Sequence, residues 1–215
     1  MRKEILSNLR MDQIFKLADD GKRIDGRGTM EVRPIMLEKG KFEKSNGSCL
    51  VKLGKTTLGV GIKAKLGEPY PDTPDKGAMM TTGELSPIAS PTFEAGPPRE
   101  QAIEFARVVD RSIREGGIID FSRLCITPGE KIWMLFMDLH VLDYDGNLFD
   151  AGNYGVLGAL SVANLPWSEI PELNREDERL PLGSKPVSLT FVKINDVIMV
   201  DPNLDEDIVA QARLT

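Results

Sequence analysis

Residues 132–163 read Ile132-Trp-Met-Leu-Phe-Met-Asp-Leu-His-Val-Leu-Asp-Tyr-Asp-Gly-Asn-Leu-Phe-Asp-Ala-Gly-Asn-Tyr-Gly-Val-Leu-Gly-Ala-Leu-Ser-Val-Ala163. This stretch predicts a long apolar strand, a turn at Asp145-Gly146 and a helix of small residues. A glycine-rich turn at the start of a helix can hold an anion through its unpaired backbone N–H groups. However, residues 150–155 offer no basic side chain, and the carboxylate of Asp150 would repel an anion or cap the helix. The layout of an anion site is present with the wrong charge.

The segments on either side of this stretch predict one α+β domain over residues 1–215, with helices packed on a mixed sheet. An amphipathic helix is expected at about residues 2–19, and four short strands within residues 31–86 are expected to form an antiparallel meander. The remaining expected elements are a helix at 98–115, strands at 124–126 and 131–143, a helix at 149–164, and strands at 187–194 and 197–200.

Composition limits the functional classes. The chain has 215 residues, 41% of them hydrophobic, and a net charge of −6, which argues against a protein that coats nucleic acid with its whole surface. No run approaches a membrane span and the N-terminus does not resemble a signal peptide, so we expect no membrane partner and a cytoplasmic location. Cys49 and Cys125 lie in apolar runs and are expected to be reduced core residues rather than a disulfide or metal ligands.

The expected helix at 98–115 carries arginines on its polar face. Arg107 and Arg111 lie four residues apart, which places two like charges on neighbouring turns. One interpretation is a solvated face with internal pairs, Glu104 with Arg107 and Asp110 with Arg114. The other is contact with adjacent phosphates, which two guanidinium groups one turn apart would suit.

Two weaker signals have ordinary structural interpretations. Gly54-Lys55-Thr56 resembles the end of a phosphate-binding loop, but Cys49 stands where the first glycine is required, so we expect a hairpin turn. His140 shares a strand face with Asp138, as an acid–base pair would, yet no nucleophile is evident nearby. A histidine satisfied within the core is the favoured interpretation.

The acidic residues near the C-terminal end of the sequence leave two possibilities open. They could bind Mg²⁺, which favours carboxylate ligands, or they could form a solvated acidic loop. The second is the more common outcome. The residues concerned are Asp201, Asp205, Glu206 and Asp207.

Several motifs carry a resemblance to a known family. Arg23-Ile-Asp-Gly-Arg27, followed by Val32-Arg-Pro-Ile35, resembles the first signature of the RNase PH-type exoribonucleases. Residues 86–98, 106–114 and 138–147 are similar to the non-catalytic RNase PH-like subunit of the archaeal exosome. The resemblance covers almost the whole chain and implies a β-α-β-α domain like that of a ribosomal protein. Family members continue into C-terminal helices, which we expect to be missing from this sequence.

Two departures from the active members imply that no residue of this chain is catalytic. Active members have a Gly-Ser/Thr-Arg phosphate site where this sequence has Gly152-Asn153-Tyr154, and an aspartate where it has Ala210-Gln211-Ala212-Arg213-Leu214. We expect no bound metal and no cofactor. We therefore expect phosphorolysis, in which phosphate releases a nucleoside diphosphate from the RNA end, to be absent from the isolated chain.

The resemblance further implies the partners. Three such chains would alternate with three active RNase PH-like paralogues in a hetero-hexameric ring, a trimer of heterodimers, with RNA-binding cap subunits as further partners. Single-stranded RNA would pass through the ring and meet Arg107, Arg111 and Arg114. The alternative is an active exoribonuclease, phosphorolytic or metal-assisted, that uses Asp201, Asp205 or Asp207. A third hypothesis is a purely structural ring member.

Overall fold

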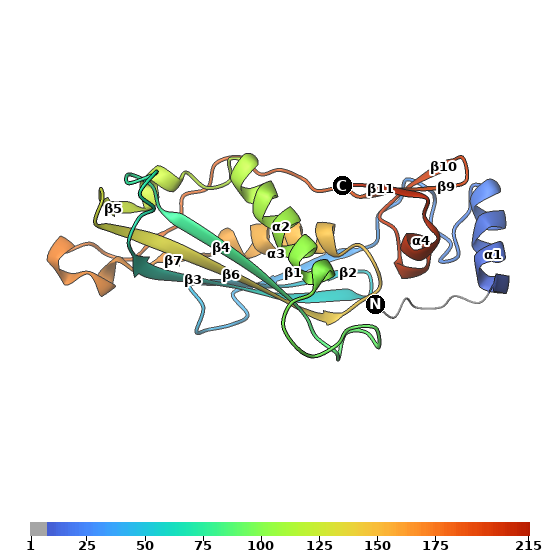
Figure 1. Ribbon diagram of the computed structural model, residues 1–215, viewed down its shortest axis with the longest axis horizontal. Coiled ribbons are helices and arrows are strands. Elements are labelled where there is room, and N and C mark those ends of the chain that lie inside the picture. The colour runs from blue at the N-terminus through green and yellow to red at the C-terminus, as the bar shows by residue number, and fades with distance from the viewer. Residues whose placement is uncertain (1–7) are drawn as a thin grey trace.

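The computed structural model describes residues 8–215, so the first residues of the expected N-terminal helix lie outside it. Its long axis runs from a sheet covered by two helices to a smaller unit that holds the first and last helices (Figure 1). The helices are α1 (Asn8–Asp19), α2 (Glu100–Glu115), α3 (Leu148–Leu160) and α4 (Leu204–Val209). The strands are β1 (Ile35–Lys39), β2 (Gly47–Leu53), β3 (Thr56–Gly67), β4 (Ala78–Leu85), β5 (Cys125–Thr127), β6 (Lys131–Asp143), β7 (Asn164–Leu165), β8 (Glu178–Arg179), β9 (Phe191–Ile194), β10 (Val197–Val200) and β11 (Ala212–Leu214).

The main sheet has the order β1-β2-β3-β6-β4, and β5 pairs with β6. The first three strands are antiparallel, and the β2–β3 hairpin turns at Gly54, which confirms the hairpin prediction. The expected meander is wrong for β4, which lies parallel to β6 rather than beside β3. The segment between β4 and β6 contains α2, and a helical crossover of this kind returns the chain parallel to the strand before it.

Both α2 and α3 cover the same face of this sheet (Figure 1). The buried face of α2 is the one that helical periodicity predicts, with Ala102, Phe105, Ala106, Val109 and Ile113. The small residues of α3 have a steric reason. A Cβ on Gly155 would lie 2.8 Å from Val60 and 2.9 Å from Val51, so only glycine lets the helix rest directly on β2 and β3.

A second, smaller core lies beyond the sheet, between α1, α4 and the strands β9 and β10. Its buried members are Ile14, Ala18, Val192, Ile194, Met199 and Val209. The acidic residues of α4 form a helix rather than the expected loop, because Asn203 and Glu206 make a reciprocal capping box at its start.

Buried ion pairs join the N-terminal signature to the last strands. Arg23 donates to Glu206 at 2.9 Å and to the carbonyl of Val200 at 2.8 Å. Arg33 donates to Asp201 at 2.9 Å and 2.7 Å, and its carboxylate partner is fully buried. The signature residues thus hold the second core in place, because each buried charge requires its partner.

Both cysteines are free. Cys49 is fully buried, whereas Cys125 is only partly so. Within residues 8–215, no helix is both long and apolar enough to cross a bilayer.

Candidate nucleic-acid interface

Two arginines on the outer face of α2 are exposed and unpaired. Arg107 and Arg111 are solvent-exposed, and neither side chain forms an ion pair or hydrogen bond with any residue from 8 to 215. The pair expected between Glu104 and Arg107 does not form, since Glu104 pairs with Arg213 at 3.2 Å instead. Two like charges therefore stand one helical turn apart without a neutralising partner.

Arg114 differs from the other two. Its guanidinium donates to Asp110 and to the carbonyl of Met79, both at 2.6 Å, and it lies over the ring of Phe121. The Asp110–Arg114 pair is confirmed. Arg114 thus fastens the end of α2 to β4, and less of its charge is left for a phosphate.

The turn at the start of α3 is filled by internal hydrogen bonds. Asn147 caps the helix by accepting from the N–H of Asp150, so capping by Asp150 itself is wrong. Asp150 is 2% exposed. It accepts from the N–H of Thr190 at 2.8 Å, from Ser188 Oγ at 2.6 Å and from Asn147 Nδ2 at 2.7 Å. Its carboxylate ties α3 to the segment before β9, and its negative charge opposes an anion there.

The polar side chains of Asn153 and Tyr154 also form hydrogen bonds within the protein. Asn153 is buried, and its amide donates to the carbonyl of Phe149 at 2.9 Å and to Ser188 at 3.2 Å. The hydroxyl of Tyr154 donates to the carbonyl of Ser188 at 2.6 Å. Burial, reinforced by the charge of Asp150, raises the pKa of Tyr154 to about 12. The hydrogen bonds of Asn153 and Tyr154 hold α3 against the segment before β9.

A cavity of about 450 Å³ lies beside this turn, between the starts of α2 and α3 and helix α4. Its lining includes Glu104, Phe149, Asp207 and Arg213. Arg213 pairs with Glu104 at 3.2 Å and with Asp207 at 3.4 Å, and its guanidinium lies over the ring of Phe149. The arginine is already neutralised by two carboxylates, which makes the cavity a poor phosphate site. No pattern in the sequence indicates this role of Arg213.

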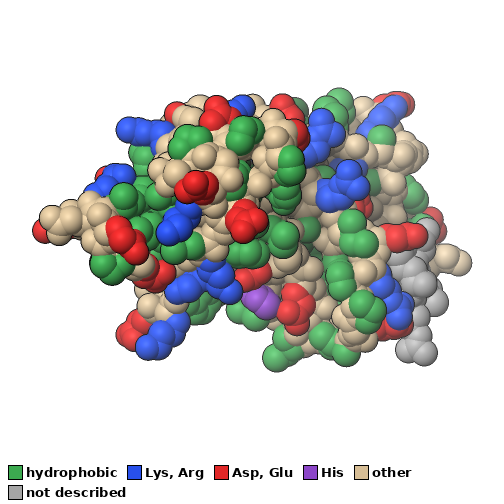
Figure 2. Space-filling view, turned by 60° about the vertical axis from the view of Figure 1, so that its left-hand side comes forward, with side chains coloured by type: hydrophobic (Ala, Val, Ile, Leu, Met, Phe, Trp, Pro, Cys, Tyr) green, Lys and Arg blue, Asp and Glu red, His purple; other side chains and the backbone are tan. Residues whose placement is uncertain are grey.

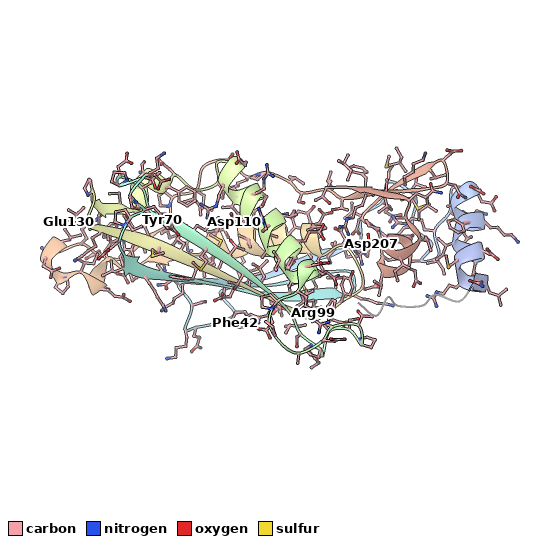
Figure 3. All side chains as sticks on the ribbon, in the orientation of Figure 1. Phe42, Tyr70, Arg99, Asp110, Glu130 and Asp207 are labelled. Atoms are coloured by element: carbon pink, nitrogen blue, oxygen red, sulfur yellow. The ribbon has the colours of Figure 1, made fainter. Side chains whose placement is uncertain are left out.

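The acidic residues do not converge on one point. Asp201 and Glu206 are buried in the ion pairs described above, so a solvated loop is wrong for both. Asp205 accepts a hydrogen bond from Arg10 at 2.9 Å. Asp207, labelled in Figure 3, forms an ion pair with Arg213. Burial raises the pKa of Asp207. Among the described residues, no group of three or more His, Cys, Asp or Glu is arranged to hold a metal ion.

The expectation that His140 lies in the core is wrong. Its ring lies 3.1 Å from Glu84 on the uncovered face of the sheet, and its side chain is 52% exposed. The chain's single histidine is visible at the surface in Figure 2. Asp138, on the same face, accepts from Thr82 at 2.6 Å rather than from His140.

Comparison with known proteins identifies the family. The model of the 3′ exoribonuclease family (RNase PH), domain 1, matches residues 31–166, and that of domain 2 matches residues 185–215. The exosome complex component Rrp42 of Methanocella arvoryzae is 50% identical over 215 residues, which cover 100% of this chain and 82% of the relative. The protein of the same name from Pyrococcus abyssi is 48% identical over 219 residues, covering 99% of this chain and 80% of the relative.

Solved structures agree with the sequence comparison. A chain of the Archaeoglobus fulgidus exosome with RNA bound to the active site superposes with a TM-score of 0.91 and 45% identity, over 96% of this chain and 80% of that one. Rice (Oryza sativa) Rrp46 shares the fold at a TM-score of 0.64 and 19% identity, over 86% of this chain and 75% of that one. The α+β fold and the resemblance noted in the sequence are confirmed, and the chain belongs to the RNase PH-type 3′ exoribonuclease family.

Proposed function

We propose that this chain is a non-catalytic, RNA-contacting and structural subunit of an archaeal-type exosome, a phosphorolytic 3′–5′ exoribonuclease complex of the cytoplasm. In this proposal three copies alternate with three active RNase PH-like paralogues in a ring, to which RNA-binding cap subunits can attach. Support comes from the relatives named exosome complex component Rrp42 and from the similarity to a chain of an RNA-bound archaeal exosome.

The geometry at the start of α3 supports the absence of catalysis. Phosphorolysis requires a bound phosphate that attacks the terminal phosphodiester, and the charge that develops must be stabilised by fixed donors. Here Asp150 presents a carboxylate, and the polar groups of Asn153 and Tyr154 bond to the protein itself. Loss of even one such donor typically removes about 3 kcal/mol of transition-state stabilisation.

The observation that carries the RNA-binding half of the proposal is the pair Arg107 and Arg111. Both are exposed, they lie one turn apart, and neither has a partner within residues 8–215. Single-stranded RNA offers adjacent backbone phosphates, which would relieve the repulsion between the two guanidinium groups. Arg114, whose guanidinium is partly committed to Asp110, is assigned a lesser contact. Contacts to phosphate carry no sequence information, so binding is expected to be largely independent of sequence.

A local contact also agrees with the acidic total. A net charge of −6 does not prevent RNA binding when a few arginines face a confined path. Several other arginines of the chain, including Arg23, Arg33 and Arg213, are paired with carboxylates and so add little to an RNA-binding field.

Catalytic silence is tested by incubating the purified chain with labelled single-stranded RNA, phosphate and Mg²⁺. No release of nucleoside diphosphate is expected from the chain alone, whereas its mixture with an active RNase PH-like paralogue should degrade the RNA. Release by the chain alone would contradict the proposal and favour the rival in which Asp201, Asp205 or Asp207 acts in catalysis. Loss of that release in the Asp207→Asn variant would identify the acid.

A further inference from the structure

Asn153 connects the turn at the start of α3 to the arginine-bearing helix. The hydroxyl of Ser112, in α2, lies within hydrogen-bond distance of the Asn153 side-chain oxygen and also 2.8 Å from the carbonyl oxygen of Val109, so its one proton is shared between these two acceptors. The amide of Asn153 donates to the carbonyl of Phe149 and to Ser188. Ser112 is the residue directly after Arg111. Asn153 is only 6% exposed, so its hydrogen bonds are protected from competing water.

The neighbouring glycine brings the two helices close enough for this bond. A Cβ on Gly152 would lie 2.6 Å from the ring of Phe105 and 3.1 Å from Val109, both buried residues of α2. The absence of a side chain at this position therefore sets the distance between α2 and α3. The Asn153–Ser112 hydrogen bond is a directional interaction between α2 and α3, whose contact near Gly152 is otherwise made by apolar side chains.

Direction matters because α2 rests on the sheet through apolar side chains. Packing of these side chains fixes the distance and the coarse orientation of α2, and hydrogen bonds, which are directional, fix its rotation more finely. Such hydrogen bonds lie on both flanks of α2. Asp110 accepts from Thr81 of β4 at 2.9 Å on one flank, and Ser112 donates to Asn153 on the other. Around the helix axis, Arg107 and Arg111 lie between Asp110 and Ser112. The direction in which the two arginines point therefore depends on both hydrogen bonds.

We infer that Asn153 is a positioning residue, which holds α2 in the rotation that presents Arg107 and Arg111 to consecutive RNA phosphates. The turn at residues 150–155 would then support RNA binding by orienting α2, without itself contacting the RNA. The inference rests on the proposed function, because it assumes that these arginines contact RNA.

The test measures RNA affinity and its salt dependence in the assembled complex with an active RNase PH-like partner, using single-stranded RNA. Ser112→Ala and Asn153→Ala each remove the bond between α2 and α3. Tyr154→Phe is the matched control, because it removes a hydrogen bond from the same helix to Ser188 without touching α2. We expect the first two variants to weaken RNA binding about two- to tenfold, and the control to bind as the unchanged protein does.

A double-variant cycle separates positioning from general destabilisation. In a complex that already carries Arg107→Ala with Arg111→Ala, removal of the Ser112 hydroxyl should cause no further loss of affinity. An equal loss in both backgrounds would show a general structural effect and overturn the inference. If Asn153→Ala does not assemble, Ser112→Ala decides, because alanine is a good helix former at that site.

The remaining outcomes show whether the positioning role of Asn153 fails alone or together with the proposed RNA contact. Unchanged binding by Ser112→Ala and Asn153→Ala, alongside weakened binding by the double arginine variant, overturns the inference and leaves the proposed function standing. Unchanged binding by the double arginine variant overturns both.

Discussion

Replacing Asp201 by asparagine should strongly destabilise the fold. The carboxylate is fully buried and accepts from the N–H of Arg33 at 2.8 Å, from its guanidinium at 2.9 Å and 2.7 Å, from Arg27 at 3.1 Å and from Asn147 at 2.7 Å. Asparagine keeps the shape but removes the charge, and its amide brings two donors to a site that already supplies donors. Buried Arg33 then keeps only Asp145, a partly exposed carboxylate 3.7 Å away, as a counter-charge.

The expected magnitude follows from that loss. Removal of one partner from a buried ion pair costs about 3 to 5 kcal/mol, because the remaining charge is stranded away from water. A domain of ordinary stability has about 5 to 15 kcal/mol in total. The Asp201→Asn variant should therefore unfold at a much lower denaturant concentration.

The assay is equilibrium urea unfolding of the chain beside a matched control. Asp196→Asn makes the same chemical change at a fully exposed side chain, 3.6 Å from Lys193, and should leave the unfolding midpoint almost unchanged because water screens the pair. An equal and small loss for both variants would refute the reasoning. It would mean that Asp201 is solvated, as the sequence alone indicates.

The same site predicts a dependence on pH. Burial alone would raise the pKa of Asp201, but the hydrogen bonds and charge of Arg33 outweigh it and hold the pKa below its ordinary value. A depressed pKa contributes stability above the unfolded carboxyl pKa of about 3.9, and this contribution disappears as pH falls through the folded value. The difference in stability between the unchanged protein and Asp201→Asn should therefore shrink as pH is lowered below about 4.

Three further predictions concern other parts of the molecule. Gly152→Ala should lower the free energy of unfolding by about 1 to 3 kcal/mol, because the new methyl group overlaps Phe105; an unchanged thermal midpoint would contradict the close approach of α2 and α3. His140→Ala should change stability by less than about 0.5 kcal/mol in the same assay, as expected for an exposed residue. In a spectrophotometric alkaline titration, Tyr154 should ionise near pH 12, and Tyr154→Phe should remove that late step.

Local patterns predict the local structure. The buried face of α2 follows from the recurrence of apolar residues at helical spacing, and the strand expected at 131–143 is β6 as observed. The resemblance to RNase PH-type proteins adds the family, which is confirmed, and the expectation of departures from active members at 152–154 and 210–214.

Long-range partners explain what the sequence could not show. The acidic run near residue 201 suggests a solvated loop because the arginine that pairs with Asp201 in the interior, Arg33, lies 168 residues earlier in the chain. The pairing of β4 with β6 likewise depends on a crossover, not on any property of β4 itself. For His140, strand alternation shows that neighbours face opposite ways, but only the packing of α2 and α3 decides which face is covered.

The most direct test of the proposed function is the salt dependence of RNA affinity for Arg107→Ala with Arg111→Ala in the assembled complex. Each phosphate neutralised on a single strand contributes about 0.7 to the slope of log affinity against log salt, so loss of two contacts should reduce the slope by about 1.4. Lys41→Ala with Lys44→Ala is the matched control, because it also removes two exposed positive charges. These lysines lie in the loop that contains Phe42, below the sheet in Figure 3, whereas Asp110 marks α2 above the sheet.

We predict weaker binding and a flatter slope for the arginine variant, with the lysine variant unchanged. Equal affinity and equal slope for the arginine variant and the unchanged complex would contradict the claim that this chain contacts RNA through α2.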